Sequence, residues 1–156
     1  MSSVHFFYNE VRFKLRTPRK VTSWIKRVVD KEGSSIQEIN YVFCSDSYLL
    51  TMNQGFLKHN TLTDIITFDN SEKASVLEGE IYISVERVEE NAKKYNVPFE
   101  DELNRVMIHG VLHLLGYKDK KTTEKALMRK KEEACLSLRA NSFTWNNSMG
   151  LRLTLI

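Results

Sequence analysis

The chain has 156 residues, of which 42% are hydrophobic and 28% are charged, with a formal net charge of +3. This length and composition are typical of one globular domain with a real core and exclude a disordered or fibrous chain. No apolar run approaches the ~20 residues of a membrane span, and the N-terminus lacks the pattern of a secretory signal. Cys44 and Cys135 stand far apart in apolar surroundings. They indicate free thiols in a reducing cytoplasm and no zinc finger, so we expect a cytoplasmic protein without membrane contact.

The N-terminal third predicts a strand followed by a helix. Residues Val4–Leu15 are rich in strand formers, and their second half alternates apolar and basic side chains. Thr17 is expected to cap the helix, with Pro18 in its first position. An apolar stripe at helical spacing then continues until Gly33.

The middle of the chain predicts two strands around a short helix. Ile36–Phe43 is rich in isoleucine and aromatic residues, as buried strands are, and Thr63–Phe68 is a shorter β-branched run. Ser45 and the residue after it are expected to cap the helix between them. Gly55–Asn60 is predicted to be a loop.

The last part predicts one strand and three helices. Gly79–Ser84 is the strand, and its final serine is expected to cap a helix over Val85–Tyr95. Pro98 precedes a helix over Phe99–Leu115, and a long final helix begins at Thr122 or the next residue and reaches about Leu138. Because strands and helices interleave without a strict βαβ rhythm, we expect an α+β fold, a single domain over residues 1–140 with a small mixed sheet. Residues 141–156 read as an edge strand or tail of unknown role.

The most informative residues are three possible metal ligands, His109, His113 and Asp119. Histidines four apart project from one face of a helix, and Gly116 offers the left-handed residue that ends such a helix before the aspartate. A His-x-x-x-His pair alone is weak evidence, because a histidine on an apolar helix is more often a core residue. Here the helix is predicted to be buried, and two unpaired imidazoles would each cost about 1–3 kcal/mol. One shared metal ion would remove this cost for both imidazoles, so we predict a catalytic metal centre.

Zinc suits this ligand set, since three protein ligands leave a fourth tetrahedral position for water. Two histidines and a carboxylate also describe non-haem iron sites, although those usually lie within a barrel. The general base is not assigned: Gly110 occupies the position where zinc peptidases carry glutamate. Asp64 and Glu80 are weak candidates. Asp64 could equally be a cap or turn residue, and Glu80 is more often a solvated turn residue in such a position.

Basic residues concentrate near the N-terminus without an intervening acid. They are Arg12, Lys14, Arg16, Arg19, Lys20, Lys26 and Arg27. Such a run is usually a solvated face, but together with a metal centre it favours a polyanionic substrate.

The segment from His109 to Tyr117 resembles the signature of the YbeY family of bacterial endoribonucleases, His-Gly-x-Leu-His-Leu-x-Gly-Tyr-Asp-His. Thr63–Phe68 and Gly79–Ser84 resemble two further motifs of the family, and the likeness extends roughly over Ile36–Leu138. The resemblance implies an α+β domain with a zincin-like helix, one zinc ion, and hydrolysis of RNA phosphodiesters. It also implies roles in 3′-end maturation of small-subunit ribosomal RNA and in ribosome quality control, with the ribosome or its small subunit as partner.

Among the departures from the family pattern, which include Leu62 for its proline and Lys118 for its aspartate, two bear directly on the site. The family's third histidine falls on Asp119, which can still bind zinc, and its basic loop residue falls on Leu57. Lys58 and His59 follow at once and are candidates for that phosphate-binding or catalytic role, or are exposed loop residues without one.

The leading hypothesis is a zinc-dependent endoribonuclease that acts on single-stranded ribosomal RNA. In this hypothesis six basic residues hold the RNA backbone: Arg12, Lys14, Arg16, Arg19, Lys20 and Arg27. A metallopeptidase or amidase is a second hypothesis, against which Gly110 counts. A non-catalytic ribosome-assembly factor with a structural metal is a third. The oligomeric state does not follow from the sequence.

Overall fold

The computed structural model describes residues 3–56 and 63–141, and the described strands form one mixed sheet in the order β1-β2-β4-β3. The strands are β1 (Ser3–Tyr8), β2 (Ser35–Cys44), β3 (Ile65–Asp69) and β4 (Val76–Ser84). The first, second and fourth are parallel, and β3 pairs antiparallel with β4 at the edge. This mixed sheet, combined with helices in a single small domain, confirms the predicted α+β class.

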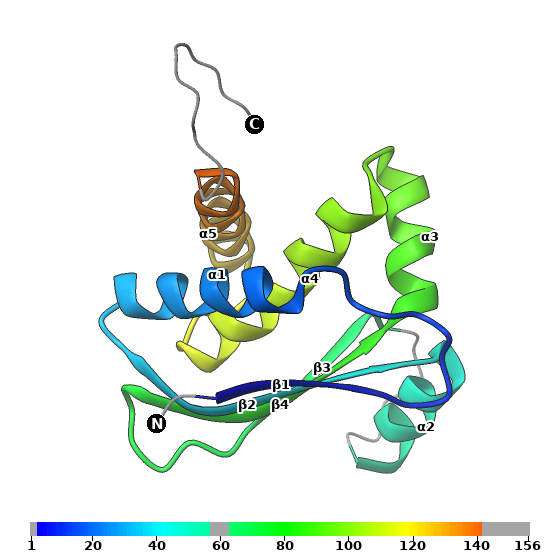
Figure 1. The fold of residues 1–156 in the computed structure, drawn as a ribbon, viewed down its shortest axis with the longest axis horizontal. Coiled ribbons are helices and arrows are strands. Elements are labelled where there is room, and N and C mark those ends of the chain that lie inside the picture. Colours follow the sequence, from blue (N-terminus) through cyan, green and yellow to red (C-terminus); the bar gives the residue numbers. More distant parts are fainter. Residues whose placement is uncertain (1–2, 57–62, 142–156) are drawn as a thin grey trace.

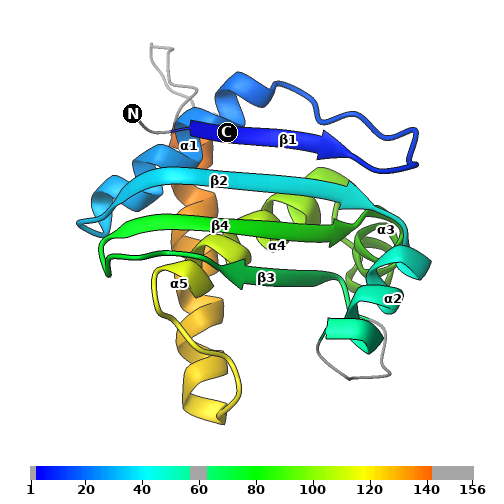
Figure 2. The ribbon, with the colours of Figure 1, turned by 90° about the horizontal axis from the view of Figure 1, so that it is seen from below.

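Four helices cover one face of the sheet: α1 (Pro18–Lys31), α3 (Val85–Tyr95), α4 (Phe99–Leu114) and α5 (Thr122–Asn141). Figure 1 shows α2 (Asp46–Phe56) on the other side, at one end of the sheet. Figure 2 shows α5 running across the direction of the strands. Within the described residues, no helix is both long and apolar enough to cross a membrane.

Helix α4 is the centre of the core because it packs on β3 and β4 with almost all of its surface covered. Met107 and Val111 are fully buried, and the buried Tyr41 hydroxyl donates a hydrogen bond to the Met107 carbonyl at 3.0 Å. At Gly110 the helix comes so close to the sheet that an added Cβ would lie 2.9 Å from Cδ1 of Ile81. The helix that carries both histidines is therefore fixed at short range against the sheet.

Several local signals in the sequence are confirmed. The Ser45 hydroxyl accepts a hydrogen bond from the Tyr48 amide at 3.1 Å, and the Ser84 hydroxyl accepts one from the Arg87 amide at the same distance. Both serines therefore cap the helices that follow them. Gly116 has a φ of 106°, which ends α4 as predicted.

Other expectations are wrong. The predicted strand over Val4–Leu15 ends at Tyr8, since Glu10 has a φ of 56° and turns the chain; the Leu15 amide then donates to the Tyr8 hydroxyl at 3.1 Å. The apolar side chains of 11–15 do face the core alternately, but without a partner strand. Thr17 does not cap α1: its φ is 47°, and its hydroxyl donates to the neighbouring carbonyl of residue 16.

The predicted loop over Gly55–Asn60 begins later than expected, because α2 continues through Gly55 to Phe56. The remainder of that loop, with Lys58 and His59, lies outside the described residues, as do residues 142–156 of the proposed tail.

Candidate metal centre

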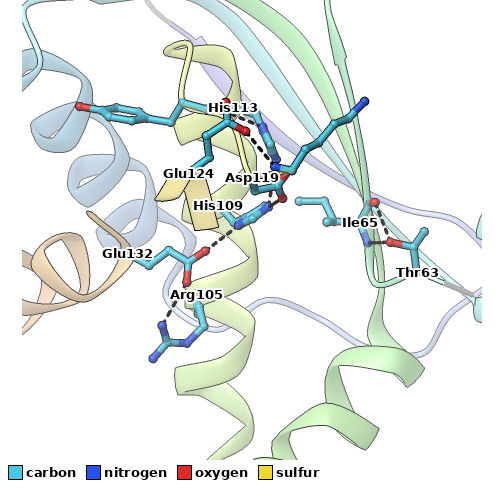
Figure 3. Close-up of polar contacts among 10 residues, drawn as sticks. Thr63, Ile65, Arg105, His109, His113, Asp119, Glu124 and Glu132 are labelled. Atoms are coloured by element: carbon cyan, nitrogen blue, oxygen red, sulfur yellow. Dashed lines mark hydrogen bonds and ion pairs between the residues drawn. The ribbon is translucent and has the colours of Figure 1, made fainter. Parts of the chain in front are cut away.

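The structure brings together His109, His113 and Asp119, the three residues predicted as ligands (Figure 3). The Nε2 atoms of the two imidazoles lie 3.0 Å apart. Asp119 Oδ2 lies 3.1 Å from Nε2 of His109 and 3.3 Å from Nε2 of His113. Atoms that bind zinc tetrahedrally at about 2.0–2.2 Å lie about 3.3–3.6 Å from one another. Small outward shifts would therefore open this triangle for one metal ion.

The second nitrogen of each imidazole is already bonded to the protein. His113 Nδ1 lies 3.0 Å from the Tyr117 carbonyl, which can only accept, so this nitrogen carries the proton. His109 Nδ1 lies 2.6 Å from Oε2 of Glu132 and donates to that carboxylate. Both Nε2 atoms consequently point a lone pair at the centre, which is the tautomer that a metal ligand needs.

The centre concentrates negative potential. Two imidazole lone pairs and a carboxylate oxygen converge within 3.3 Å, and such acceptors repel one another unless a cation or a proton lies between them. Burial opposes protonation of His109, but the hydrogen bond and charge of Glu132, with Asp119 and Asp64, outweigh it and raise the pKa of this imidazole. The same negative charges favour a bound metal cation, so the residues fit one.

The chain between the second and third ligands is held by a separate ion pair. The Tyr117 hydroxyl donates to Glu32 Oε1 at 2.8 Å, and Lys131 Nζ donates to the other carboxylate oxygen at 2.9 Å. Glu32 immediately follows α1 and Lys131 lies on α5, so two elements distant in sequence anchor Tyr117. Because the Tyr117 carbonyl orients His113, this anchor fixes one ligand and the segment that delivers Asp119.

The three ligands lie in a cleft of about 730 Å³ between β3 and the C-terminal end of α4. The side chains of Asn53, Thr67 and Lys120 contribute to its walls beside the ligands. A substrate bound in this cleft would lie beside the three candidate ligands.

The two candidate bases differ in position. Asp64 precedes β3 and lines the cleft together with His109, and burial raises the pKa of its carboxyl group. Glu80 lies on β4 between Gly79 and Ile81, which face the helices, so its side chain projects from the opposite face of the sheet. There it accepts a hydrogen bond from the Tyr82 hydroxyl at 3.3 Å. The structure does not bring Glu80 to the metal ligands.

The six basic residues predicted to bind RNA are exposed but are not among the described residues that line the cleft. Arg19, Lys20 and Arg27 surround a separate depression of about 190 Å³ on α1. Arg16 forms an exposed ion pair with Glu100 at 3.2 Å. The two others are Arg12 and Lys14, and the Lys14 ammonium lies over the Tyr8 ring. Arg27 also donates a hydrogen bond to the Leu138 carbonyl.

Sequence reasoning assigned no role to Glu132, which is 6% exposed and contacts His109 directly. Arg105, one helical turn before His109, holds this carboxylate with Nη1 at 3.1 Å. The order Arg105–Glu132–His109 is visible in Figure 3. A metal-bound histidine usually donates its other ring N–H to a carboxylate or a carbonyl, which is a signal that an acid should lie near His109. The sequence does not indicate that this acid comes from α5.

The fold and ligand set define the class of protein: a small α+β domain whose central helix and following loop carry a ligand set suited to a catalytic metal ion. Within that class, the endoribonuclease YbeY family matches residues 7–139, and the chain belongs to this family of RNA-cleaving hydrolases. The resemblance found in the sequence motifs is thereby confirmed.

Individual members of the family are similar in sequence to this chain over most of their length. The endoribonuclease YbeY of Cytophaga hutchinsonii is 51% identical over 137 residues, covering 88% of this chain and 96% of that protein. That of Flavobacterium psychrophilum is 52% identical over 132 residues, covering 85% and 94%. The solution structure of TM1509 from Thermotoga maritima is similar with a TM-score of 0.62 and 27% identity, covering 88% of this chain and 89% of that one.

Proposed function

We propose that this protein is a zinc-dependent endoribonuclease that cleaves single-stranded ribosomal RNA in the cytoplasm. Its proposed roles are late 3′-end maturation of the small-subunit RNA and ribosome quality control, with the ribosome or its small subunit as partner. Family membership supports the reaction class. The observation that carries the metal dependence is the convergence of His109, His113 and Asp119 within 3.3 Å.

When bound, zinc would lower the pKa of water towards neutrality and polarise a phosphoryl oxygen. The chain's own residues prepare that chemistry: Glu132 and the Tyr117 carbonyl hold the two imidazoles in the ligand tautomer. Asp64 is the candidate proton acceptor, because its carboxyl lines the cleft and its raised pKa favours holding a proton there.

The substrate would cross the cleft as an extended strand. Lys120 lines the cleft beside Asp119 and can offset phosphate charge close to the ligands. The exposed basic residues of α1, with Arg19, Lys20 and Arg27 around one depression, would hold the RNA backbone at a distance from the scissile bond. Lys58 and His59 are candidates for a similar role within the segment outside the described residues.

A peptidase is disfavoured by the packing of Gly110. Zinc peptidases place a glutamate base directly after the first histidine of the helix. In this structure that position faces Ile81 and Ile65 of the sheet, and even a Cβ atom would lie within 3.1 Å of both side chains. No general base can therefore project from this position into the cleft.

The proposal is tested with His113→Ala and with His5→Ala as a matched control, since His5 is exposed on β1 and not among the described residues that line the cleft. We expect His113→Ala to lose bound zinc and cleavage of single-stranded RNA, whereas His5→Ala keeps both. Cells that rely on His113→Ala should accumulate small-subunit RNA with an unprocessed 3′ end. Undiminished cleavage by metal-free protein would contradict the proposal. Unfolding of the protein on removal of zinc would favour a structural metal.

A further inference from the structure

A second cavity, of about 180 Å³, adjoins the metal cleft. The two share Asp64, Ile65 and His109, so these residues form the wall between them. The second cavity extends towards the N-terminal half of α4, on the side of His109 where Figure 3 shows Arg105 and Glu132. A group bound there would lie directly beside whatever occupies the metal centre.

Glu102 places a carboxylate in the wall of this cavity, and the protein provides no hydrogen-bond donor to it among the described residues. The residue is 5% exposed and lines the cavity, and its contact with Nε of Arg105 spans 3.9 Å, too long for a hydrogen bond. Among the described residues, its carboxylate accepts no hydrogen bond. Burial accordingly raises the pKa of this carboxyl group. A largely buried carboxylate that lacks protein donors needs them from water or from a ligand, and a ligand with N–H groups could supply them from the cavity.

The rest of the cavity suits a flat, polar ring. Tyr95, at the end of α3, lines it and is 55% exposed, and Arg129 lines it from an exposed position on α5. Phenol rings and guanidinium groups are the planar surfaces on which unpaired bases stack. Asn91 also lines the cavity and brings an amide side chain to its wall.

We propose that this cavity is a subsite for one nucleobase of the RNA strand, with guanine preferred, adjacent to the phosphodiester at the metal centre. This inference rests on the proposed function, since it assumes an RNA strand in the cleft. Glu102 recognises the base, Tyr95 stacks on it, and Asn91 supplies a further polar contact.

The preference for guanine follows from the carboxylate. Guanine presents two adjacent N–H donors, N1–H and the 2-amino group, which match the two oxygens of Glu102. Adenine and cytosine place a ring acceptor beside their amino group, and uracil flanks its single N–H with carbonyls. Each of these would set an oxygen or nitrogen lone pair against a carboxylate oxygen. A well-formed bidentate pair is worth roughly tenfold or more in discrimination.

The test compares binding of guanosine, adenosine, cytidine and uridine 5′-monophosphate to the metal-loaded protein by calorimetry. All four share the phosphate, so a difference in affinity reports the base. We expect guanosine monophosphate to bind at least about tenfold more tightly than the others. Glu102→Gln should remove that preference, because the amide presents a donor to one of the guanine N–H groups.

Two matched controls separate base recognition from effects on the arginine and on the surface. Glu133→Gln removes another carboxylate that pairs with Arg105, at 2.6 Å, from outside the cavity. Tyr48→Leu removes an exposed ring on α2 and is compared with Tyr95→Leu. Both controls should keep the preference, whereas Tyr95→Leu should weaken binding of all four nucleotides.

Cleavage of a random single-stranded RNA, with the cut sites sequenced, is measured on the same variants. Guanine should be enriched at one position next to the cut in the wild type and not in Glu102→Gln. Equal affinity for the four nucleotides, or a preference unchanged by Glu102→Gln, would overturn the base subsite even if RNA is cleaved. Selective binding without any cleavage would contradict the proposed nuclease function and leave the subsite supported.

Discussion

Oε2 of Glu132 accepts a hydrogen bond from Nδ1 of His109 at 2.6 Å, although the two residues are 23 positions apart on different helices. Oε1 of the same carboxylate accepts from Arg105, so the acid is held on both sides. The contact links the packing of α5 on α4 to the orientation of a metal ligand. The affinity of the centre should therefore depend on a residue that cannot itself reach the metal.

Glu132→Gln should lower metal affinity by about 10- to 100-fold, since an amide is a weaker acceptor and makes His109 less basic. Competition with a chromogenic zinc chelator measures the change. Glu133→Gln, on the same helix and bonded to the same arginine, is the control and should bind zinc as the wild type does. Equal affinities for the two variants would show that Glu132 does not tune the ligand.

Asp119 should be replaceable by histidine but not by alanine. Asp119→Ala removes one of three ligands and should lose zinc on dialysis, together with RNA cleavage. Asp119→His supplies a neutral nitrogen donor at the position where the family pattern has histidine, and should retain both. Elemental analysis of the dialysed proteins, with cleavage assays, checks this; a zinc content unaffected in Asp119→Ala would exclude it as a ligand.

Glu32→Gln should destabilise the fold in a pH-dependent way. Burial opposes ionisation of Glu32, but the hydrogen bonds and charge from Lys131 and Tyr117 outweigh it, and its pKa lies below the ordinary value of 4.5. A group with a lowered folded pKa contributes stability above its unfolded pKa and loses it as the pH falls through the folded value. At pH 7 we expect a loss of about 1 kcal/mol in the free energy of unfolding.

Urea unfolding of the wild type and Glu32→Gln, both with chelator present, measures this difference from pH 7 downwards. The difference should shrink as Glu32 becomes protonated in the folded protein. Glu86→Gln is a control, because Glu86 accepts from an exposed amide on α2 and does not contact Tyr117. A difference that stays constant down to about pH 2 would contradict the assigned role of the charge.

Gly110→Ala should destabilise the protein despite the better helix propensity of alanine. The added Cβ would lie 2.9 Å from Cδ1 and 3.0 Å from Cγ2 of Ile81, and such overpacking costs about 1–3 kcal/mol against a propensity gain of about 1 kcal/mol. Thermal unfolding measures the net loss. Ile81→Val removes Cδ1 and should restore part of it in the double variant; strictly additive losses would show that the contact is not responsible.

Much of the fold could be predicted because its signals are local. Ser45, Ser84 and Gly116 mark helix ends through contacts within a few residues, and the structure confirms them. The prediction that Thr17 caps α1 is wrong although it rested on an equally local signal, a threonine directly before Pro18. The backbone at Thr17 is left-handed, and its side chain does not cap the helix. Residues 11–15 alternate in burial as a strand does, yet whether they pair depends on a turn at Glu10.

The sequence by itself determined the three candidate ligands, because His109 and His113 share one helical face and Gly116 returns the chain to Asp119. Only the tertiary structure decided which residues distant in sequence contact and orient these ligands. Packing of α5 on α4 brings Glu132 to His109, and the end of α1 supplies Glu32. Asp64 lies at the cleft just before β3, whereas the alternation along β4 turns Glu80 to the other face of the sheet. These contacts join residues that are far apart in the sequence. They depend on how helices and strands pack against one another, which the spacing of residues along the chain does not specify.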